Sequence, residues 1–266
     1  MAQQTGVDRV VPKWHEFLRR WPTPCHLARA DLADVLQLWS GLGYPRRARN
    51  LHRAADAIVV VHGGEVPRDL GDLLALPGVG PYTARAVLAF AFEERVGVVD
   101  TNVARVLARC DGHRLTALQV QAMADEWASA ADPWLWNQSI MEVGALHCRP
   151  TARCDGCPIA PACAWSSSHD DAIDPARGSA GVSRPQAAFR GSDREARGRL
   201  LSAALTAPVP PDALAAAAGL ADDVPRAERI AMGLRADGLL DRGGDGSWTA
   251  PRGGFIRSAI RSEEGA

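Results

Sequence analysis

Four cysteines fall within sixteen residues of this chain, at Cys148, Cys154, Cys157 and Cys163. Thiolates at such short intervals suit either a tetrahedral zinc ion or a [4Fe–4S] cluster. Zinc sites usually come as two close pairs separated by a longer loop, whereas here one close pair is flanked by two single cysteines. The pattern therefore predicts a metal centre, and it fits the cluster better than zinc.

The composition indicates a globular protein that can bury one large core or two smaller ones. The chain has 266 residues, of which 47% are hydrophobic. It contains no run of about eighteen apolar residues and opens without the basic flank or apolar core of a signal peptide. We therefore expect a cytoplasmic protein, in which clustered cysteines more often hold metal than form disulfides. Cys25 and Cys110 lie far from the cysteine cluster and are predicted to be ordinary buried thiols.

The formal net charge of −1 argues against binding nucleic acid by bulk electrostatics, because many DNA-binding domains are strongly basic. Any phosphate contact must then be local, made by helix N-termini, backbone amides or short arginine-rich stretches. The arginines that form such a stretch are Arg46, Arg47, Arg49 and Arg53.

The first 165 residues are predicted to be all-α. Between Val7 and Trp21 the apolar residues recur at three- and four-residue intervals, as on one face of an amphipathic helix. Turn signals such as Gly-Leu-Gly at 41–43 separate the further helices. Those helices are expected at 31–40, 46–62, 69–75, 81–92, 102–110, 116–131 and 134–148. The best strand candidate is the short run 96–99.

From residue 166 the composition shifts to Ser, Asp, Gly, Pro and Ala, which predicts a mobile linker over 166–190. A small unit follows at 191–252. Its helices are expected near 193–205, 211–218 and 226–237, before a hairpin at 239–249. This order resembles a winged helix, although other small α/β tails share it. Residues 253–266 are predicted to be disordered.

The segment 76–80 reads Leu-Pro-Gly-Val-Gly and precedes a predicted helix that begins at Pro81. Two glycines around one apolar residue allow a tight turn whose backbone amides face outward. The N-terminus of the following helix adds partial positive charge, so the turn can hold a DNA phosphate without a basic side chain. A simple turn between helices is the alternative, but the apolar faces on both sides favour a helix-hairpin-helix.

Asp100 lies about twenty residues downstream, where the chain enters another predicted helix. An aspartate in this position is most often an N-cap. Because it follows the hairpin, we favour a chemical role, in which the carboxylate stabilises the positive charge that develops on a sugar as its base departs. Its neighbour Asn102 is placed to hold that carboxylate.

Together these motifs resemble the helix-hairpin-helix/Gly-Pro-Asp DNA glycosylase superfamily, most closely its adenine glycosylases of the MutY type. The resemblance covers about residues 1–165. The matching segments are 3–5, 39–44, 49–51, 76–83, 99–106, 137–138 and 141–145. It implies a mainly α, two-lobed fold with a small C-terminal winged-helix-like unit. The six-helix barrel with its helix-hairpin-helix would span 21–110, and the cluster-bearing helical lobe would comprise 1–20, with its first helix incomplete, and 111–165.

The resemblance also implies residue roles. Asp100 would stabilise the oxocarbenium-like state at C1′, with Asn102 in support. Tyr82 falls where glycosylase-lyases keep a nucleophilic lysine, and a phenol cannot form a Schiff base, so the enzyme would be monofunctional. The four clustered cysteines would ligate a [4Fe–4S] cluster. The implied DNA-binding residues are Gln3, Gln4, Thr5, Tyr44, Gly78, Val79, Gly80 and Thr83.

The implied activity is removal of adenine mispaired with guanine or 8-oxoguanine, during base excision repair of double-stranded DNA. The reaction would proceed by protonation of adenine N7, departure of the base and capture of the cation by water. The protein would act as a monomer on the DNA of a bacterial nucleoid. A thymine/uracil mismatch glycosylase of the same superfamily is the alternative, because related thymine glycosylases also carry a tyrosine in the position of Tyr82.

Three features depart from the family pattern. The family's general-acid glutamate precedes Gln-Gln-Thr, whereas this chain begins at Met1. We expect a start codon assigned too far downstream; otherwise the chain would be a catalytically impaired mismatch-DNA-binding protein, since general-acid help is worth roughly 10²–10⁴-fold. The first cysteine gap is five residues, where the family usually has six. The C-terminal region does not resemble the MutT-like domain that recognises 8-oxoguanine, and looks more like the short tails of actinobacterial homologues.

Overall fold

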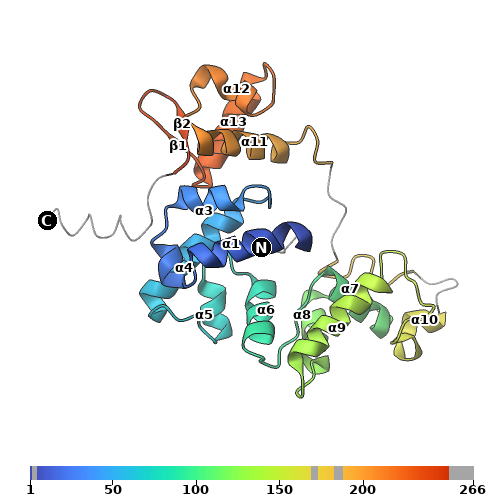
Figure 1. Ribbon diagram of the computed structural model, residues 1–266. Coiled ribbons are helices and arrows are strands. Elements are labelled where there is room, and N and C mark those ends of the chain that lie inside the picture. The colour runs from blue at the N-terminus through green and yellow to red at the C-terminus, as the bar shows by residue number, and fades with distance from the viewer. Residues whose placement is uncertain (2–4, 169–172, 183–187, 252–266) are drawn as a thin grey trace. The chain divides into compact units, whose positions relative to one another are not determined.

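A computed structural model describes residues 1, 5–168, 173–182 and 188–251 of the chain. The described residues are mainly helical and include two short strands, which confirms the predicted fold class (Figure 1). The chain divides into two compact units. Unit 1 comprises Met1–Pro67, Leu76–Gly78 and Ala187–Ala266, and unit 2 comprises Arg68–Ala75 and Val79–Gln186. This division differs from the lobe boundaries implied by the family resemblance, which stay a prediction.

Unit 1 begins with four helices whose bounds mostly agree with the periodicity of the sequence. They are α1 (Val7–Arg20), α2 (Pro24–Ala28), α3 (Leu32–Trp39) and α4 (Arg46–His62). Helix α2 was not predicted because five residues are too few to show a helical period. Local chemistry still specifies it, since Thr23 accepts a hydrogen bond from the backbone amide of His26 and Pro24 occupies the first helical position.

The C-terminal part of unit 1 contains the predicted helices followed by a hairpin. Its elements are α11 (Asp193–Thr206), η2 (Pro211–Ala213), α12 (Leu214–Ala217), α13 (Val224–Ala236), β1 (Asp241–Arg242) and β2 (Trp248–Thr249). The strands pair antiparallel, with Asp241 opposite Thr249. The predicted helix at 211–218 is split into η2 and α12. The predicted disordered tail at 253–266 lies outside the described residues.

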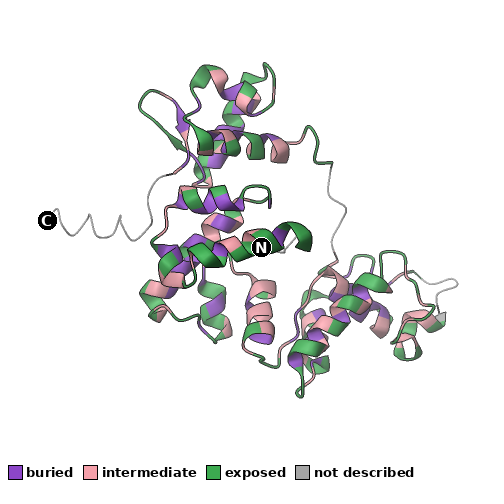
Figure 2. Ribbon diagram, viewed as in Figure 1, coloured by how far each residue is buried: buried purple, intermediate pink, exposed green. Residues whose placement is uncertain are grey.

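The two parts of unit 1 share a hydrophobic core. Leu36 and Trp39 of α3 belong to the same buried cluster as Leu200 of α11 and Leu234 of α13. Figure 2 shows buried positions on all three helices. Helices α3 and α11 pack against each other. The C-terminal segment therefore completes the interior that the N-terminal helices begin, instead of folding around a separate core.

Unit 2 is built around a central buried helix. Its elements are α5 (Leu70–Ala75), α6 (Pro81–Ala91), α7 (Thr101–Asp111), α8 (Ala117–Trp127), α9 (Pro133–Leu146), η1 (Ala160–Ala162) and α10 (Ala164–Ser168). Every residue of α7 from Val103 to Arg109 is buried, and α8, α9 and α10 pack against it. The fold thereby fixes the helix that begins directly after Asp100.

The predicted strand at 96–99 is wrong, because these residues form no strand in the structure. The side chain of Asn137 on α9 takes the place of a partner strand. Its Oδ1 accepts from the backbone amide of Val98 at 2.8 Å, and its Nδ2 donates to the carbonyl of Val96 at 3.0 Å. A buried amide thus satisfies the extended backbone that the β-branched residues favour.

The predicted mobile linker is also wrong for residues 173–182, which pack on unit 2. Ser179 is buried and accepts a hydrogen bond from the amide of Leu115. Asp174 forms an ion pair with the buried guanidinium of Arg109 at 2.8 Å. Although partial burial opposes the shift, the hydrogen bond from Arg109 holds the pKa of Asp174 below its usual range. A buried cation needs such a counter-charge, which local composition does not reveal.

Candidate active site and metal centre

The glycine-rich turn has the backbone geometry that the sequence predicts. Gly78 has a φ of +78°, which favours glycine because it lacks a Cβ. Gly80 occupies the N-cap of α6 and Pro81 its first turn. A glycine N-cap has no side-chain oxygen to offer the first-turn amides, so this helix start suits an external anion. Val79, Gly80 and Thr83, which the sequence offers as phosphate contacts, lie at this start of α6, and the contact itself stays a prediction.

Asp100 is both a helix cap and an oriented carboxylate. Its Oδ1 accepts from the backbone amide of Val103 at 2.8 Å, which makes it the N-cap of α7. Its Oδ2 accepts from the side-chain amide of Asn102 at 3.2 Å. The structural role and the predicted chemical role are therefore compatible, because the cap uses one oxygen and Asn102 orients the other.

Tyr82 on α6 belongs to the same electrostatic environment. Burial, and then the negative charge of Asp100, raise the pKa of the Tyr82 phenol above its usual value. A raised pKa keeps the phenol protonated at neutral pH. The pair thus combines a hydrogen-bond donor with a carboxylate, and it contains no amine that could form a covalent bond with a sugar.

A buried arginine, Arg105, connects Asn102, the hydrogen-bond partner of Asp100, to the cysteine-rich loop. Arg105 donates from Nη2 to Oδ1 of Asn102 and to the carbonyl of Gly144, each at 2.8 Å. Its Nε donates to the carbonyl of Cys148. A Cβ on Gly144 would lie 2.5 Å from the Cβ of Asn102, so glycine is needed for α9 to approach α7 this closely. Neither Arg105 nor Gly144 was among the predicted site residues.

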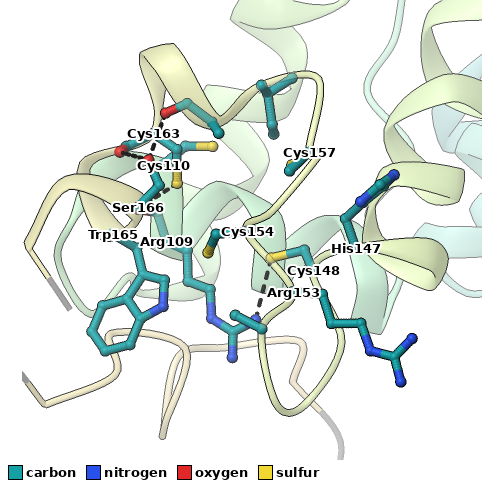
Figure 3. A pocket seen from close by; sticks show the side chains of 13 residues that line it. Arg109, Cys110, His147, Cys148, Arg153, Cys154, Cys157, Cys163, Trp165 and Ser166 are labelled. Carbon is teal, nitrogen blue, oxygen red and sulfur yellow. Dashed lines mark hydrogen bonds between the residues drawn. The ribbon is translucent and has the colours of Figure 1, made fainter. Parts of the chain in front are cut away.

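The four clustered cysteines line one cavity in unit 2. Figure 3 shows Cys154 and Cys157 in the loop after α9, with the side chain of Arg109 reaching in from α7. The Nη1 of Arg109 lies 3.3 Å from the Sγ of Cys148. Cys110 also lines this cavity. The interpretation of Cys110 as a thiol remote from the cluster is therefore wrong, because α7 brings it to the same cavity as four cysteines that follow it by 38 to 53 positions.

The cavity's donor set fits a metal cluster. Burial raises the pKa of the Cys148 thiol, although Arg109 opposes the shift. Burial and then the neighbouring Cys163 and Cys157 raise the pKa of Cys154. A bound cation reverses this effect, because it stabilises the thiolates that otherwise repel one another. Among the described residues the thiols do not converge into a closed ligand set, but soft sulfur donors around one cavity suit iron or zinc.

Thr5, a predicted DNA contact, is bonded in unit 1 to the loop that carries Tyr44, another predicted contact. The hydroxyl of Thr5 donates to the carbonyl of Leu42 at 2.8 Å, in the loop that carries Tyr44. Tyr44 has a φ of +48°, a strained conformation for a residue with a Cβ. Tyr44 is 38% exposed, so the loop presents this residue to solvent. Gln3 and Gln4 lie outside the described residues.

Comparisons with known proteins decide the family. The model of the "HhH-GPD superfamily base excision DNA repair protein" matches residues 1–129. An adenine DNA glycosylase of Mycobacterium tuberculosis is 40% identical over 265 residues, which cover 96% of this chain and 84% of the relative. This chain belongs to the adenine DNA glycosylase family of the HhH-GPD superfamily.

Members of this family differ in how much of the chain they match. The adenine DNA glycosylase of Mycolicibacterium smegmatis is 38% identical over 251 residues, covering 92% of this chain and 83% of the relative. The human adenine DNA glycosylase is 41% identical over 171 residues, covering 61% of this chain and 31% of its own length. Matches that cover more than nine-tenths of the chain must include its C-terminal part, so the mycobacterial relatives share that part.

Solved structures of the superfamily agree on the fold. A complex of endonuclease III with DNA has a TM-score of 0.55 at 26% identity, covering 62% of this chain and 79% of that chain. A thermostable thymine-DNA glycosylase has a TM-score of 0.57 at 24% identity, with the same coverage. Finally, no described helix has the length and hydropathy needed to cross a membrane.

Proposed function

We propose that this chain is a monofunctional DNA N-glycosylase, which hydrolyses the bond between adenine and deoxyribose in double-stranded DNA. Its substrate is adenine paired with guanine or 8-oxoguanine. The observation that carries the proposal is the Asp100 carboxylate, oriented by Asn102 beside the phenol of Tyr82, in a chain whose relatives are adenine DNA glycosylases. The thymine/uracil alternative has less support, because the likeness to the thymine-DNA glycosylase, at 24% identity, is one of fold alone.

Asp100 stabilises positive charge at C1′ as the base departs, and water then captures the cation. Asn102 keeps the carboxylate in one orientation, which matters because preorganised groups need not rearrange during the reaction. Tyr82 provides no amine, so no Schiff base forms and the product is an intact strand with an abasic site. The base must leave the stack before Asp100 can reach its sugar.

The turn at 76–80 and the start of α6 bind a phosphate of the DNA backbone. The partial positive charge of the helix N-terminus supplies the attraction, which is consistent with a chain that has no bulk positive charge. In unit 1, Thr5 fixes the Leu42 carbonyl and so supports the loop of Tyr44, whose exposed ring inserts near the target base. The protein acts on the duplex as a monomer.

Cys148, Cys154, Cys157 and Cys163 would hold a [4Fe–4S] cluster. Because all four lie between the end of α9 and the start of α10, the bound group would supply a structural cross-link within that segment through thiolate ligation. Arg109 donates toward the sulfur of Cys148 and offsets the negative charge of the thiolates.

The test is a single-turnover assay on labelled duplexes that contain one adenine opposite guanine or 8-oxoguanine. Alkali-sensitive sites should accumulate, strands should stay intact without alkali, and Asp100→Asn should abolish excision while duplex binding persists. A matched duplex with thymine opposite guanine is the substrate control. Release of thymine but not adenine would support the alternative, and full activity of Asp100→Asn would contradict the mechanism.

A further inference from the structure

Three arginines converge on Asp237, the residue that follows α13. The Nη2 of Arg46 lies 2.7 Å from one carboxylate oxygen, and Arg197 of α11 pairs with the other. Arg49 donates from Nη1 to the backbone carbonyl of Asp237. A helix C-terminus carries partial negative charge, so this end of α13 favours cations. The C-terminal segment thus engages two of the α4 arginines that the sequence offers as phosphate contacts.

Arg49 extends this contact toward the N-terminal helices. Its Nη2 donates to Oδ1 of Asn50 at 3.0 Å, so one planar guanidinium contacts both the Asp237 carbonyl and the Asn50 amide. The Nε of Arg49 is buried with no hydrogen-bond partner in the described part of the chain. Such a group is costly to bury, which indicates that the two other contacts fix the side chain.

Asn50 in turn lies directly against the hairpin. A Cβ built on Gly78 would be 2.5 Å from the Cβ of Asn50 and 2.6 Å from its Nδ2. The Asn50 side chain therefore fills the space beside Gly78. A residue with a side chain at position 78 would collide with it. The asparagine packs against the backbone of the turn, which leaves the turn little room to shift.

We propose that the C-terminal segment, residues 188–251, positions the DNA-binding hairpin through a relay of Asp237, Arg49, Asn50 and Gly78. All four residues belong to unit 1. Arg49 and Asn50 act as positioning residues: they hold the turn in the conformation that meets a phosphate, and neither needs to touch DNA. This inference rests on the proposed function, because it assigns duplex binding to the hairpin.

The first experiment measures binding of the full chain to a duplex with a tetrahydrofuran abasic analogue opposite guanine, by fluorescence anisotropy. Arg49→Ala and Asn50→Ala should each weaken binding about fivefold, and the double variant should be no weaker than the poorer single variant, because both break the same relay. Arg49→Ala should leave the slope of log Kd against log salt unchanged. Additive losses, or a slope lower by about one, would mean that Arg49 contacts a phosphate itself, and would overturn the relay.

The second experiment needs no DNA. Hydrogen exchange of the peptide at 76–83 in the free protein should be faster in Arg49→Ala and Asn50→Ala than in wild type. Asp237→Ala removes the carboxylate that pairs with Arg46 and Arg197 and so loosens the carbonyl that Arg49 contacts, and this variant should also exchange faster. In Arg49→Lys the positive charge remains, but the planar guanidinium with its several N–H donors is lost. The peptide at 76–83 should therefore also exchange faster in this variant. Arg20→Ala, which removes an equal charge from α1 of the same unit, where Arg20 pairs with Glu16, is the control and should match wild type.

Unchanged exchange in the Arg49 and Asn50 variants would refute the relay. Thermal unfolding of each variant shows whether faster exchange is local or reflects loss of the whole fold; a global loss of stability with uniformly faster exchange would equally count against the relay. If wild type fails to bind the duplex while the exchange pattern holds, the proposed function is contradicted and the relay stands.

Discussion

Asn102 stands between a carboxylate and a buried cation: it donates to Asp100 at 3.2 Å and accepts from Arg105 at 2.8 Å. The amide therefore has one orientation that satisfies both neighbours. Because Arg105 is itself tied to the carbonyls of Gly144 and Cys148, the Asp100 carboxylate is held by a connected network. The network lies entirely within unit 2.

We expect Asn102→Ala to slow adenine excision about tenfold to a hundredfold under single-turnover conditions, because Asp100 loses its orienting partner. Duplex affinity should stay within about twofold, since the hairpin is untouched. The buried Arg105 loses an acceptor, so the free energy of unfolding should fall by about 1–2 kcal/mol. An excision rate equal to that of wild type would show that Asp100 needs no support from Asn102.

Gly144→Ala should force α7 and α9 apart, because the new Cβ would lie 2.5 Å from the Asn102 Cβ and 2.9 Å from its backbone carbonyl. Overpacking of this kind costs about 1–3 kcal/mol, and excision should slow because Asn102 shifts. Gly198→Ala on α11 is the matched control, since a Cβ there meets nothing within 4 Å. The control should raise stability by about 0.5–1 kcal/mol. Chemical denaturation of both variants measures the difference.

Cys154→Ser should reduce bound iron and the broad visible absorbance of the purified protein, because a cluster ligand is lost. Cys110→Ser should retain both, although Cys110 lines the same cavity. Iron and acid-labile sulfide analysis, with zinc determined in parallel, makes the comparison. Loss of iron in Cys110→Ser with retention in Cys154→Ser would reassign the ligand set, and stoichiometric zinc would favour the tetrahedral alternative.

Asp193 should contribute acid-sensitive stability to unit 1. Hydrogen bonds from Arg226 and Arg229 hold its pKa below the usual value. A carboxylate with a lowered pKa stabilises the fold at pH values above its unfolded-state pKa of about 4. This contribution to the free energy of unfolding disappears as the pH falls through the folded-state pKa. Urea unfolding should therefore separate wild type from Asp193→Asn at neutral pH and much less at about pH 3. The separation should be modest because the pair is exposed to solvent. An equal separation at both pH values would exclude this linkage.

Helix positions could be predicted from the sequence where apolar period and capping residues agree. The helix at 46–62 was predicted with the observed bounds, and Asp100 was recognised as the residue before α7. Local patterns specify such elements because the capping oxygen and the amide it accepts from lie within three or four residues.

The errors came from contacts between distant residues. Asn137 replaces a strand partner for 96–98, Asp174 is drawn out of an apparent linker by Arg109, and Cys110 joins the cavity across a helix. The bridge from Arg49 to Asp237 spans 188 positions. Nothing in the local composition indicates these partners, because each depends on how complete elements pack.

The burial of α7 has a consequence for how this enzyme can evolve. From Val103 to Arg109 the helix has no solvent-facing side, so nearly every substitution there disturbs packing on some neighbour. Natural or laboratory variants that accept a different base are therefore expected to accumulate changes outside α7, in the loop of Tyr44 or at the start of α6. The buried helix fixes the position of Asp100 at its N-terminus, and the exposed segments around it can change without disturbing that position.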